Sequence, residues 1–88
     1  MKVKEGFILR EMLDSYMAVP VGERTKEVHG VIGLNETGAF LWKLLEKDTS
    51  EQELIASIIK EYNLSEEIAK EDIKEYLYYL REKGWLHD

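Results

Sequence analysis

Residues Val28 to Leu45 read Val-His-Gly-Val-Ile-Gly-Leu-Asn-Glu-Thr-Gly-Ala-Phe-Leu-Trp-Lys-Leu-Leu, and they pass from a strand-like run directly into a helical pattern. The residues before Asn35 are mostly β-branched, aliphatic or glycine, which favours a strand. Asn35 offers a side-chain oxygen to the first free N–H groups of a helix. Apolar residues then recur at spacings of three and four, as in an amphipathic helix. We therefore predict a strand over 28–34, joined without a loop to a helix over Glu36–Lys47.

Two further strands are predicted upstream of this junction. Phe7–Arg10 is a first apolar run and Tyr16–Val21 is a second, with a turn candidate at Asp14-Ser15 between them. The polar segment Gly22–Glu27 is expected to be a loop that returns the chain to the third strand. Three short strands, each separated from the next by a turn, predict an antiparallel meander.

Two more helices are predicted downstream of the junction. Ser50 and Glu53 have the spacing of a capping box, which marks the start of the second helix. The third helix is expected to begin after Ser65 and to end before Gly84, because serine favours the N-cap and glycine favours the left-handed position after a helix. Trp85-Leu86 is then expected to fold back onto the core.

These elements predict an α+β fold in which a three-stranded antiparallel sheet is followed by three helices, as in a small winged-helix domain. The chain has 88 residues, no internal repeat and no segment with the composition of a linker. We therefore expect one domain over residues 1–88 with a single core.

Composition argues against several classes of function. The chain has no cysteine, so it has neither a disulfide framework nor a cysteine-based zinc site. Its net charge of −6 disfavours non-specific binding to nucleic acid or to acidic lipid. The first residues lack the apolar run of a signal peptide, and no segment reaches membrane-spanning length. A cytoplasmic protein with no membrane partner is expected.

No residue pattern points to catalysis. His29 and His87 are the only histidines, and two imidazoles with scattered carboxylates make a poor metal site, because catalytic zinc usually has three protein ligands. Gly30 and Gly33 do not form a phosphate loop, since no glycine-rich turn with a lysine opens a helix here. No serine, threonine or lysine stands beside an obvious base. We expect no enzymatic activity, no metal and no cofactor.

The third helix suggests a binding surface. Tyr76, Tyr78 and Tyr79 cannot all face one way, because consecutive helix positions differ by about 100°. At least one tyrosine must therefore be exposed, and an exposed aromatic side chain is a mild indication of an interaction site.

The predicted winged-helix topology also raises the alternative of a DNA-binding transcription regulator. A recognition helix usually carries lysine and arginine side chains that meet phosphates. The third helix instead has more acids than bases: Glu66, Glu67, Glu71, Asp72, Glu75 and Glu82 against Lys70, Lys74, Arg81 and Lys83. This balance has the wrong sign for nucleic acid.

Taken together, the segments resemble the PqqD family. The resemblance is carried by a strand leading into Leu34–Trp42, a second helix opened by Thr49–Leu54, and then Asp72-Ile73, Leu77–Leu80 and Gly84–Leu86. It covers nearly the whole chain, and Leu-Asn-Glu-Thr-Gly-Ala is its most specific part. Members are small proteins or domains with three strands followed by three helices.

The resemblance implies a non-enzymatic peptide chaperone. Family members bind the leader segment of a ribosomally made precursor peptide and present its core to a modifying enzyme, often a radical SAM protein, or in lasso-peptide relatives a leader peptidase. The leader is expected to add as a strand to the third strand, over a groove made with the third helix. The implied edge is Val28, His29, Gly30, Val31 and Ile32; the implied groove wall is Ile73, Tyr76, Leu77 and Leu80, with Lys70 and Lys74 available to acidic leader residues.

Two readings from other classes stay open at this point. One is the winged-helix transcription regulator, and the other is a regulatory subunit that only docks on an enzyme. Binding assays with DNA and with a leader peptide would separate the peptide chaperone from the transcription regulator.

Overall fold

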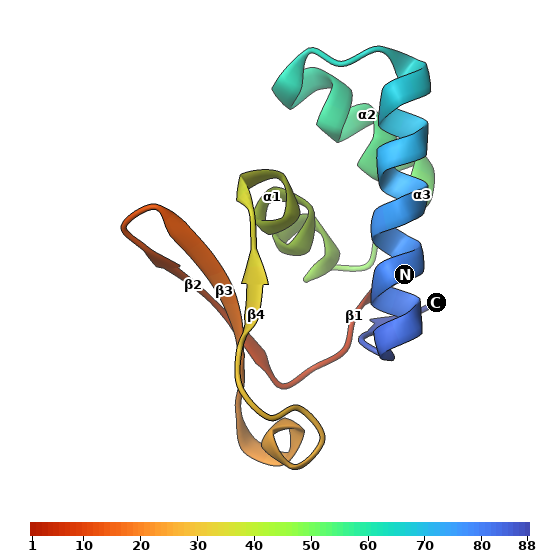
Figure 1. The fold of residues 1–88 in the computed structure, drawn as a ribbon. Helices are drawn as coiled ribbons and strands as arrows, with labels where there is room; N and C mark the ends of the chain where they lie inside the picture. Colours follow the sequence, from red (N-terminus) through yellow and green to blue (C-terminus); the bar gives the residue numbers. More distant parts are fainter.

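A hairpin and one further strand form the main sheet. The computed structural model describes every residue from Met1 to Asp88. Strands β2 (Phe7–Met12) and β3 (Ser15–Pro20) pair antiparallel, and β3 pairs antiparallel with β4 (Ile32–Leu34), so the strand order is β2-β3-β4 (Figure 1). The predicted three-stranded antiparallel sheet is confirmed, and β4 is an edge strand.

The third strand is shorter than the sequence suggested. We predicted a strand over 28–34, but β4 contains only Ile32–Leu34, so the prediction is wrong for residues 28–31. The expected polar loop contains a short 3-10 helix, η1 (Gly22–Lys26). Gly30 has a φ of 103°, a conformation that glycine adopts readily and other residues rarely do. This bend interrupts the extended backbone, so Val28 and His29 do not continue the line of β4.

The register of β4 decides which of its side chains face the helices. Ile32 lies opposite Ala18, and both side chains are buried on the inner face of the sheet. Leu34 follows two residues later on the same face, because side chains alternate along a strand. Gly33 lies opposite Met17 and is exposed.

Three helices follow the sheet, as predicted. They are α1 (Glu36–Leu45), α2 (Glu51–Tyr62) and α3 (Glu66–Lys83), with α1 ending two residues before the expected Lys47. Each predicted N-cap side chain accepts a backbone N–H: Asn35 from Gly38 at 2.7 Å, Ser50 from Glu53 at 3.1 Å and Ser65 from Ile68 at 3.3 Å. Gly84 ends α3 in the left-handed conformation, with a φ of 77°, as expected.

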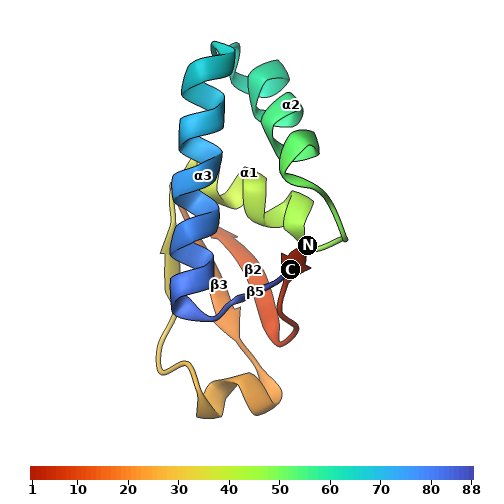
Figure 2. The same ribbon diagram turned by 90° about the vertical axis from the view of Figure 1, so that its right-hand side faces the viewer.

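The helices lie against one face of the sheet. In both views α1 lies between the sheet and the pair formed by α2 and α3 (Figures 1 and 2). Trp42 of α1 is fully buried, and Phe7 meets it edge to face with ring centroids 5.4 Å apart. None of the helices has both the length and the apolar character that crossing a membrane requires.

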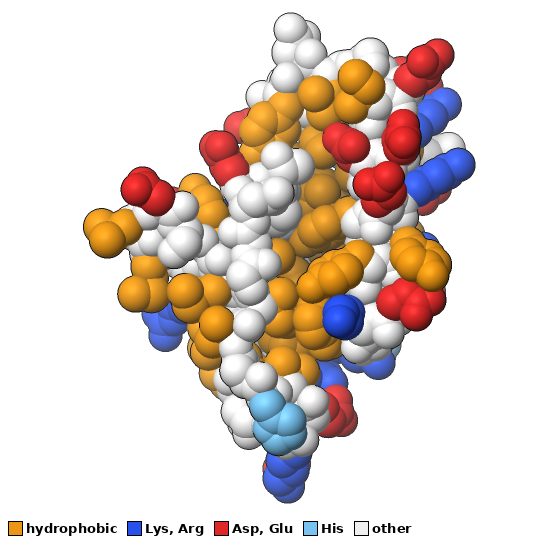
Figure 3. Space-filling model, in the orientation of Figure 1, with side chains coloured by type: hydrophobic (Ala, Val, Ile, Leu, Met, Phe, Trp, Pro, Cys, Tyr) orange, Lys and Arg blue, Asp and Glu red, His pale blue; other side chains and the backbone are white.

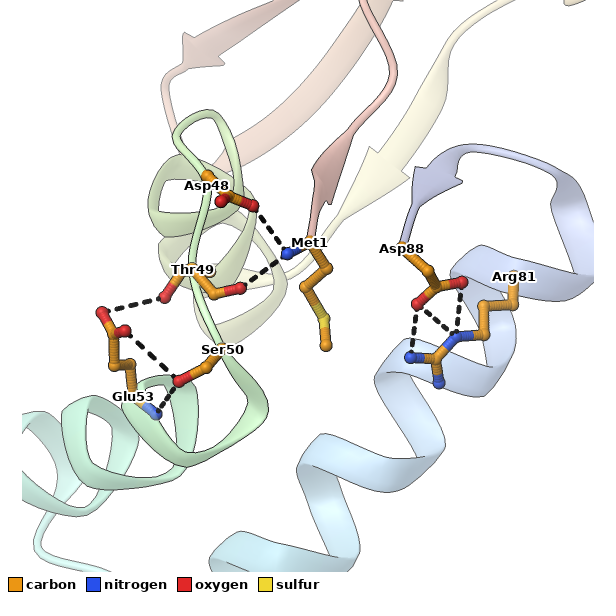
Figure 4. Close-up of polar contacts among 7 residues, drawn as sticks. All are labelled: Met1, Asp48, Thr49, Ser50, Glu53, Arg81 and Asp88. Carbon is orange, nitrogen blue, oxygen red and sulfur yellow. Dashed lines mark hydrogen bonds and ion pairs between the residues drawn. The ribbon is translucent and has the colours of Figure 1, made fainter.

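A second, two-stranded sheet joins the beginning and the end of the chain. β1 (Lys2–Val3) pairs antiparallel with β5 (Leu86–His87), a pairing that the sequence did not indicate. Leu86 is buried, so the expectation that this segment folds back onto the core is confirmed. Two ion pairs flank the small sheet: the Met1 amino group lies 2.7 Å from Asp48, and Arg81 donates two hydrogen bonds from Nε and one from Nη2 to Asp88 (Figure 4).

The Asn35 cap gives a direct test of the strand-to-helix junction. Asn35→Ala removes the acceptor for the Gly38 N–H and should lower the free energy of unfolding by about 0.5–2 kcal/mol. Asn35→Asp keeps an acceptor and serves as the matched control, which should unfold near the wild type. Urea unfolding of the three proteins measures the difference. Equal midpoints for Asn35→Ala and wild type would show that Asn35 is not the cap.

The Arg81–Asp88 pair should make stability depend on pH in the acid range. The Asp88 carboxylate accepts hydrogen bonds from the Arg81 guanidinium, and these hold the pKa of Asp88 below its usual value. Because the folded protein holds the Asp88 proton less tightly than the unfolded chain does, the ionised pair stabilises the folded state above pH ~3.9. This contribution to the free energy of unfolding is lost as pH falls through the folded-state pKa.

Thermal unfolding followed across the acid range tests this dependence. Asp88→Asn should lose less stability than the wild type as pH falls below ~3.9. Asp14→Asn is the control, because it removes an exposed carboxylate in the β2–β3 turn that makes no ion pair. Parallel curves for wild type and Asp88→Asn would contradict the linkage.

Candidate functional site

A groove of about 480 Å³ lies between β4 and α3, with the start of α1 at its base. Figure 3 shows it as a hollow floored by hydrophobic side chains, with acidic side chains along the upper part of α3. The strand and junction contribute Gly33, Leu34 and Asn35, and α1 contributes Thr37, Gly38 and Leu41. The predicted groove between the third strand and the third helix therefore exists.

Helix α3 presents two different stripes to its surroundings. Asp72, Glu75, Tyr76 and Tyr79 line the groove, and their spacings of three and four place them on one face of the helix. Ile73, Leu77 and Leu80, which the resemblance implied as groove wall, have no exposed surface and form part of the hydrophobic core. They support the groove from behind and do not line it. Of the four implied wall residues, only Tyr76 lines the groove.

The two lysines implied as peptide contacts lie away from the groove. Lys74 is two residues from both Asp72 and Tyr76, which is about 200° around the helix axis and so on the opposite side of α3. Lys70 is likewise two residues from Asp72, and its Nζ is 3.0 Å from Glu66 Oε1 in an exposed pair. The structure leaves both lysines outside the groove lining.

Tyr76 connects α3 to the beginning of α1. Its hydroxyl donates a hydrogen bond of 2.8 Å to the Gly38 carbonyl oxygen. Burial raises the pKa of the Tyr76 phenol far above its usual value, so the hydroxyl stays protonated and remains a donor. One contact across 38 residues of sequence thus joins α3 to the base of the groove.

Gly38 is required by the close packing at this contact. A Cβ atom at this position would lie 3.0 Å from the Asn35 side-chain oxygen, 3.5 Å from Leu34 and 3.6 Å from the Tyr76 ring. The first distance is tighter than ordinary contact, so with a side chain here the Asn35 oxygen would have to shift by a few tenths of an ångström. The Asn-Glu-Thr-Gly segment therefore has a physical explanation: Asn35 caps α1, and Gly38 leaves room for the cap and for Tyr76.

The open edge of the sheet lies further along the chain than the resemblance implied. Of the five residues Val28 to Ile32, only Ile32 belongs to β4, and its side chain is buried. Val28 is half-buried, whereas His29, Gly30 and Val31 are exposed in the segment before the strand. Gly33 and Leu34 line the groove and were not among the implied residues. Their position directly before the N-cap Asn35 is the sequence signal that could have located them.

The side chains do not gather into a metal centre. No group of three or more His, Asp or Glu side chains lies close enough to hold an ion. His29 precedes β4, whereas His87 lies in β5 of the separate two-stranded sheet.

A comparison with models of known protein families finds one match that spans most of the chain. The family model for coenzyme PQQ synthesis protein D, PqqD, matches residues 9–86. The chain belongs to the PqqD family. The resemblance inferred from the sequence is therefore confirmed.

A solved structure shares the PqqD-family fold. The structure described as "TbiB1 in Complex with the TbiA(beta) Leader Peptide" superposes with a TM-score of 0.76 at 22% sequence identity, over 99% of this chain and 95% of that one. At this identity the likeness establishes a common fold. No curated protein sequence gives a significant match.

Removing the Tyr76 hydroxyl should weaken the attachment of α3 to α1. Tyr76→Phe deletes the bond to the Gly38 carbonyl and should lower the free energy of unfolding by about 0.5–1.5 kcal/mol. Tyr78→Phe is the matched control, since Tyr78 is 65% exposed and makes no side-chain hydrogen bond, so it should change stability by less than ~0.5 kcal/mol. Chemical denaturation of both variants measures the contrast, and equal effects would refute the role of the bond.

Proposed function

We propose that this PqqD-family protein binds the leader segment of a ribosomally synthesised precursor peptide as an added strand along β4. The observation that carries the proposal is the open edge of β4 beside a groove of about 480 Å³. An extended peptide at a sheet edge gains main-chain hydrogen bonds, and pockets for alternate side chains supply selectivity. A protein of the same fold, TbiB1, is described in complex with a leader peptide, which supports this choice of ligand.

The backbone of β4 is accessible to an incoming strand. β4 has β3 on one side and no strand on the other, so part of its main-chain N–H and C=O groups lacks a ladder partner. Gly33 adds no side chain, and an added Cβ there would meet no atom within 4 Å. A peptide can therefore lie close to this strand without displacing side chains.

The proposed role is presentation and not catalysis. The peptide would be held for a separate modifying enzyme, such as a radical SAM protein or a leader peptidase, and this chain would act without a cofactor. The groove offers two carboxylates, two phenols and one threonine hydroxyl, with no histidine, lysine or cysteine to complete a nucleophile–base pair. We place this protein in the cytoplasm, where its peptide partner is made.

Binding assays with short peptides test the proposal directly. Candidate precursors, to be sought among the reading frames that neighbour this gene, can be made as fluorescent peptides and titrated by anisotropy. We expect saturable binding of one peptide per protein and no binding to duplex DNA at physiological salt. Binding to DNA without binding to any precursor would favour the winged-helix regulator instead.

Hydrogen exchange should locate the peptide on β4. In a strand, alternate amides point to opposite edges, so those facing β3 are already protected and those facing the groove exchange with water. Peptide binding should slow exchange at every second amide from Ile32 to Asn35. Amides of η1, far from the groove lining, provide the internal control. Tight binding with no change at any β4 amide would rule out strand addition at this edge.

Tyr79 should act as a side-chain anchor for the peptide. It lines the groove and is 43% exposed, whereas its neighbour Tyr78 is more exposed and lies outside the groove. Tyr79→Ala should weaken peptide binding by more than ~1 kcal/mol, as truncated aromatic anchors typically do. Tyr78→Ala is the control and should bind like wild type. Isothermal titration of both variants, each first shown to be folded, decides the matter, and equal affinities would move the anchor elsewhere.

A further inference from the structure

The groove lining carries negative charge without a counterion. Asp72 and Glu75 lie one turn apart on the groove face of α3, both exposed, and neither takes part in an ion pair. No lysine or arginine lines the groove. The protein's overall charge of −6 has the same sign.

Two positive features near the groove are weaker than this pair of carboxylates. The N-terminus of α1 carries a helix-dipole charge of about +0.5, but Asn35 already caps it and Glu36 lies in its first turn. Lys83 lies 5.8 Å from the centre of the Tyr79 ring, toward the C-terminal end of α3 and outside the lining. Two full negative charges therefore outweigh half a positive charge at the α1 end.

We infer that the leader segment held in this groove carries a lysine or arginine side chain facing Asp72 and Glu75. The inference rests on the proposed function and adds the charge class of the ligand to it. The charge that we infer for the leader is opposite to the one implied by the family resemblance, in which Lys70 and Lys74 would pair with acidic leader residues. Both lysines lie off the groove face, so the side chains that meet the peptide are acids and tyrosines.

The spacing of the lining also fixes where the basic residue should stand. β4 and α3 lie on opposite sides of the groove, and both run roughly upright in the two views (Figures 1 and 2). Glu75 and Tyr79 are four residues apart, or about 6 Å along α3. Two residues of an added strand span about 6.6 Å, and residues two apart face the same side. The leader should therefore carry its base two residues from an apolar or aromatic residue that contacts Tyr79.

Selection from a displayed library of random peptides tests this inference without knowledge of the natural leader. Peptides enriched on the wild-type protein should carry lysine or arginine two residues from an apolar or aromatic residue. On Asp72→Lys/Glu75→Lys the enriched residue at that position should change to aspartate or glutamate. Asp14→Lys/Glu67→Lys makes the same total change of charge at two exposed positions off the groove face, and it should still select basic peptides.

Each outcome decides between the inference and the proposed function. Peptides that protect β4 amides but show no basic preference, or a preference unchanged by Asp72→Lys/Glu75→Lys, would overturn the inference and leave strand addition standing. Failure to enrich any peptide that protects β4 would reject both. If the reversed pair does not fold, Asp72→Asn/Glu75→Gln replaces it, and a wild-type-selected peptide should bind this variant several-fold more weakly. Affinity of that peptide for the wild type should also fall as salt is raised.

Discussion

The contact between the start of α1 and the middle of α3 fixes α3 on the base of the groove. Tyr76 reaches the Gly38 carbonyl at 2.8 Å, and Gly38 leaves space for both the tyrosine ring and the Asn35 cap. Asn35 directly follows β4 and caps α1, so it marks both the end of the edge strand and the start of the helix. The neighbouring bond from Tyr76 to Gly38 then positions α3 against the same segment. A shift at this point would change the width of the groove, since its lining comes from all three elements.

Helix α3 serves the core and the groove through separate stripes. Ile73, Leu77 and Leu80 are buried, and burying each such side chain contributes about 1.5–3 kcal/mol. Asp72, Glu75 and Tyr79 line the groove and add little to the core, so they can change without loss of the buried packing. This division explains how a chain of 88 residues can keep a single core and still offer a selective surface.

The charge of α3 differs from that expected of a DNA-reading helix. In a winged-helix regulator the reading helix meets phosphates, which requires basic side chains on its exposed face. Here the exposed groove face of α3 carries two carboxylates, Lys70 and Lys74 lie off that face, and Lys83 lies one turn beyond Tyr79, outside the lining. The charge of this face can vary without disturbing the core, because the buried stripe lies on a different side of α3.

The sequence by itself determined the features that depend on near neighbours along the chain. Asn35, Ser50 and Ser65 cap their helices because each side-chain oxygen needs only an N–H three residues away. The amphipathic spacing of the helices, the three-stranded meander and the PqqD resemblance follow from local patterns of the same kind. These signals were enough to predict the fold class and the presence of a groove.

Only the tertiary structure decided which residues form the edge and line the groove. The apolar run before Asn35 reads as a long strand, but the positive φ of Gly30 shortens it to Ile32–Leu34. Helical periodicity identified a stripe at Ile73 and Leu77 but could not say whether core or ligand covers it. That choice depends on where β4 and α1 meet α3, through contacts such as Tyr76 to Gly38 that join residues 38 positions apart. The pairing of β1 with β5 was missed for the same reason, because two-residue strands carry no periodic signal and gain their stability from a partner at the other end of the chain.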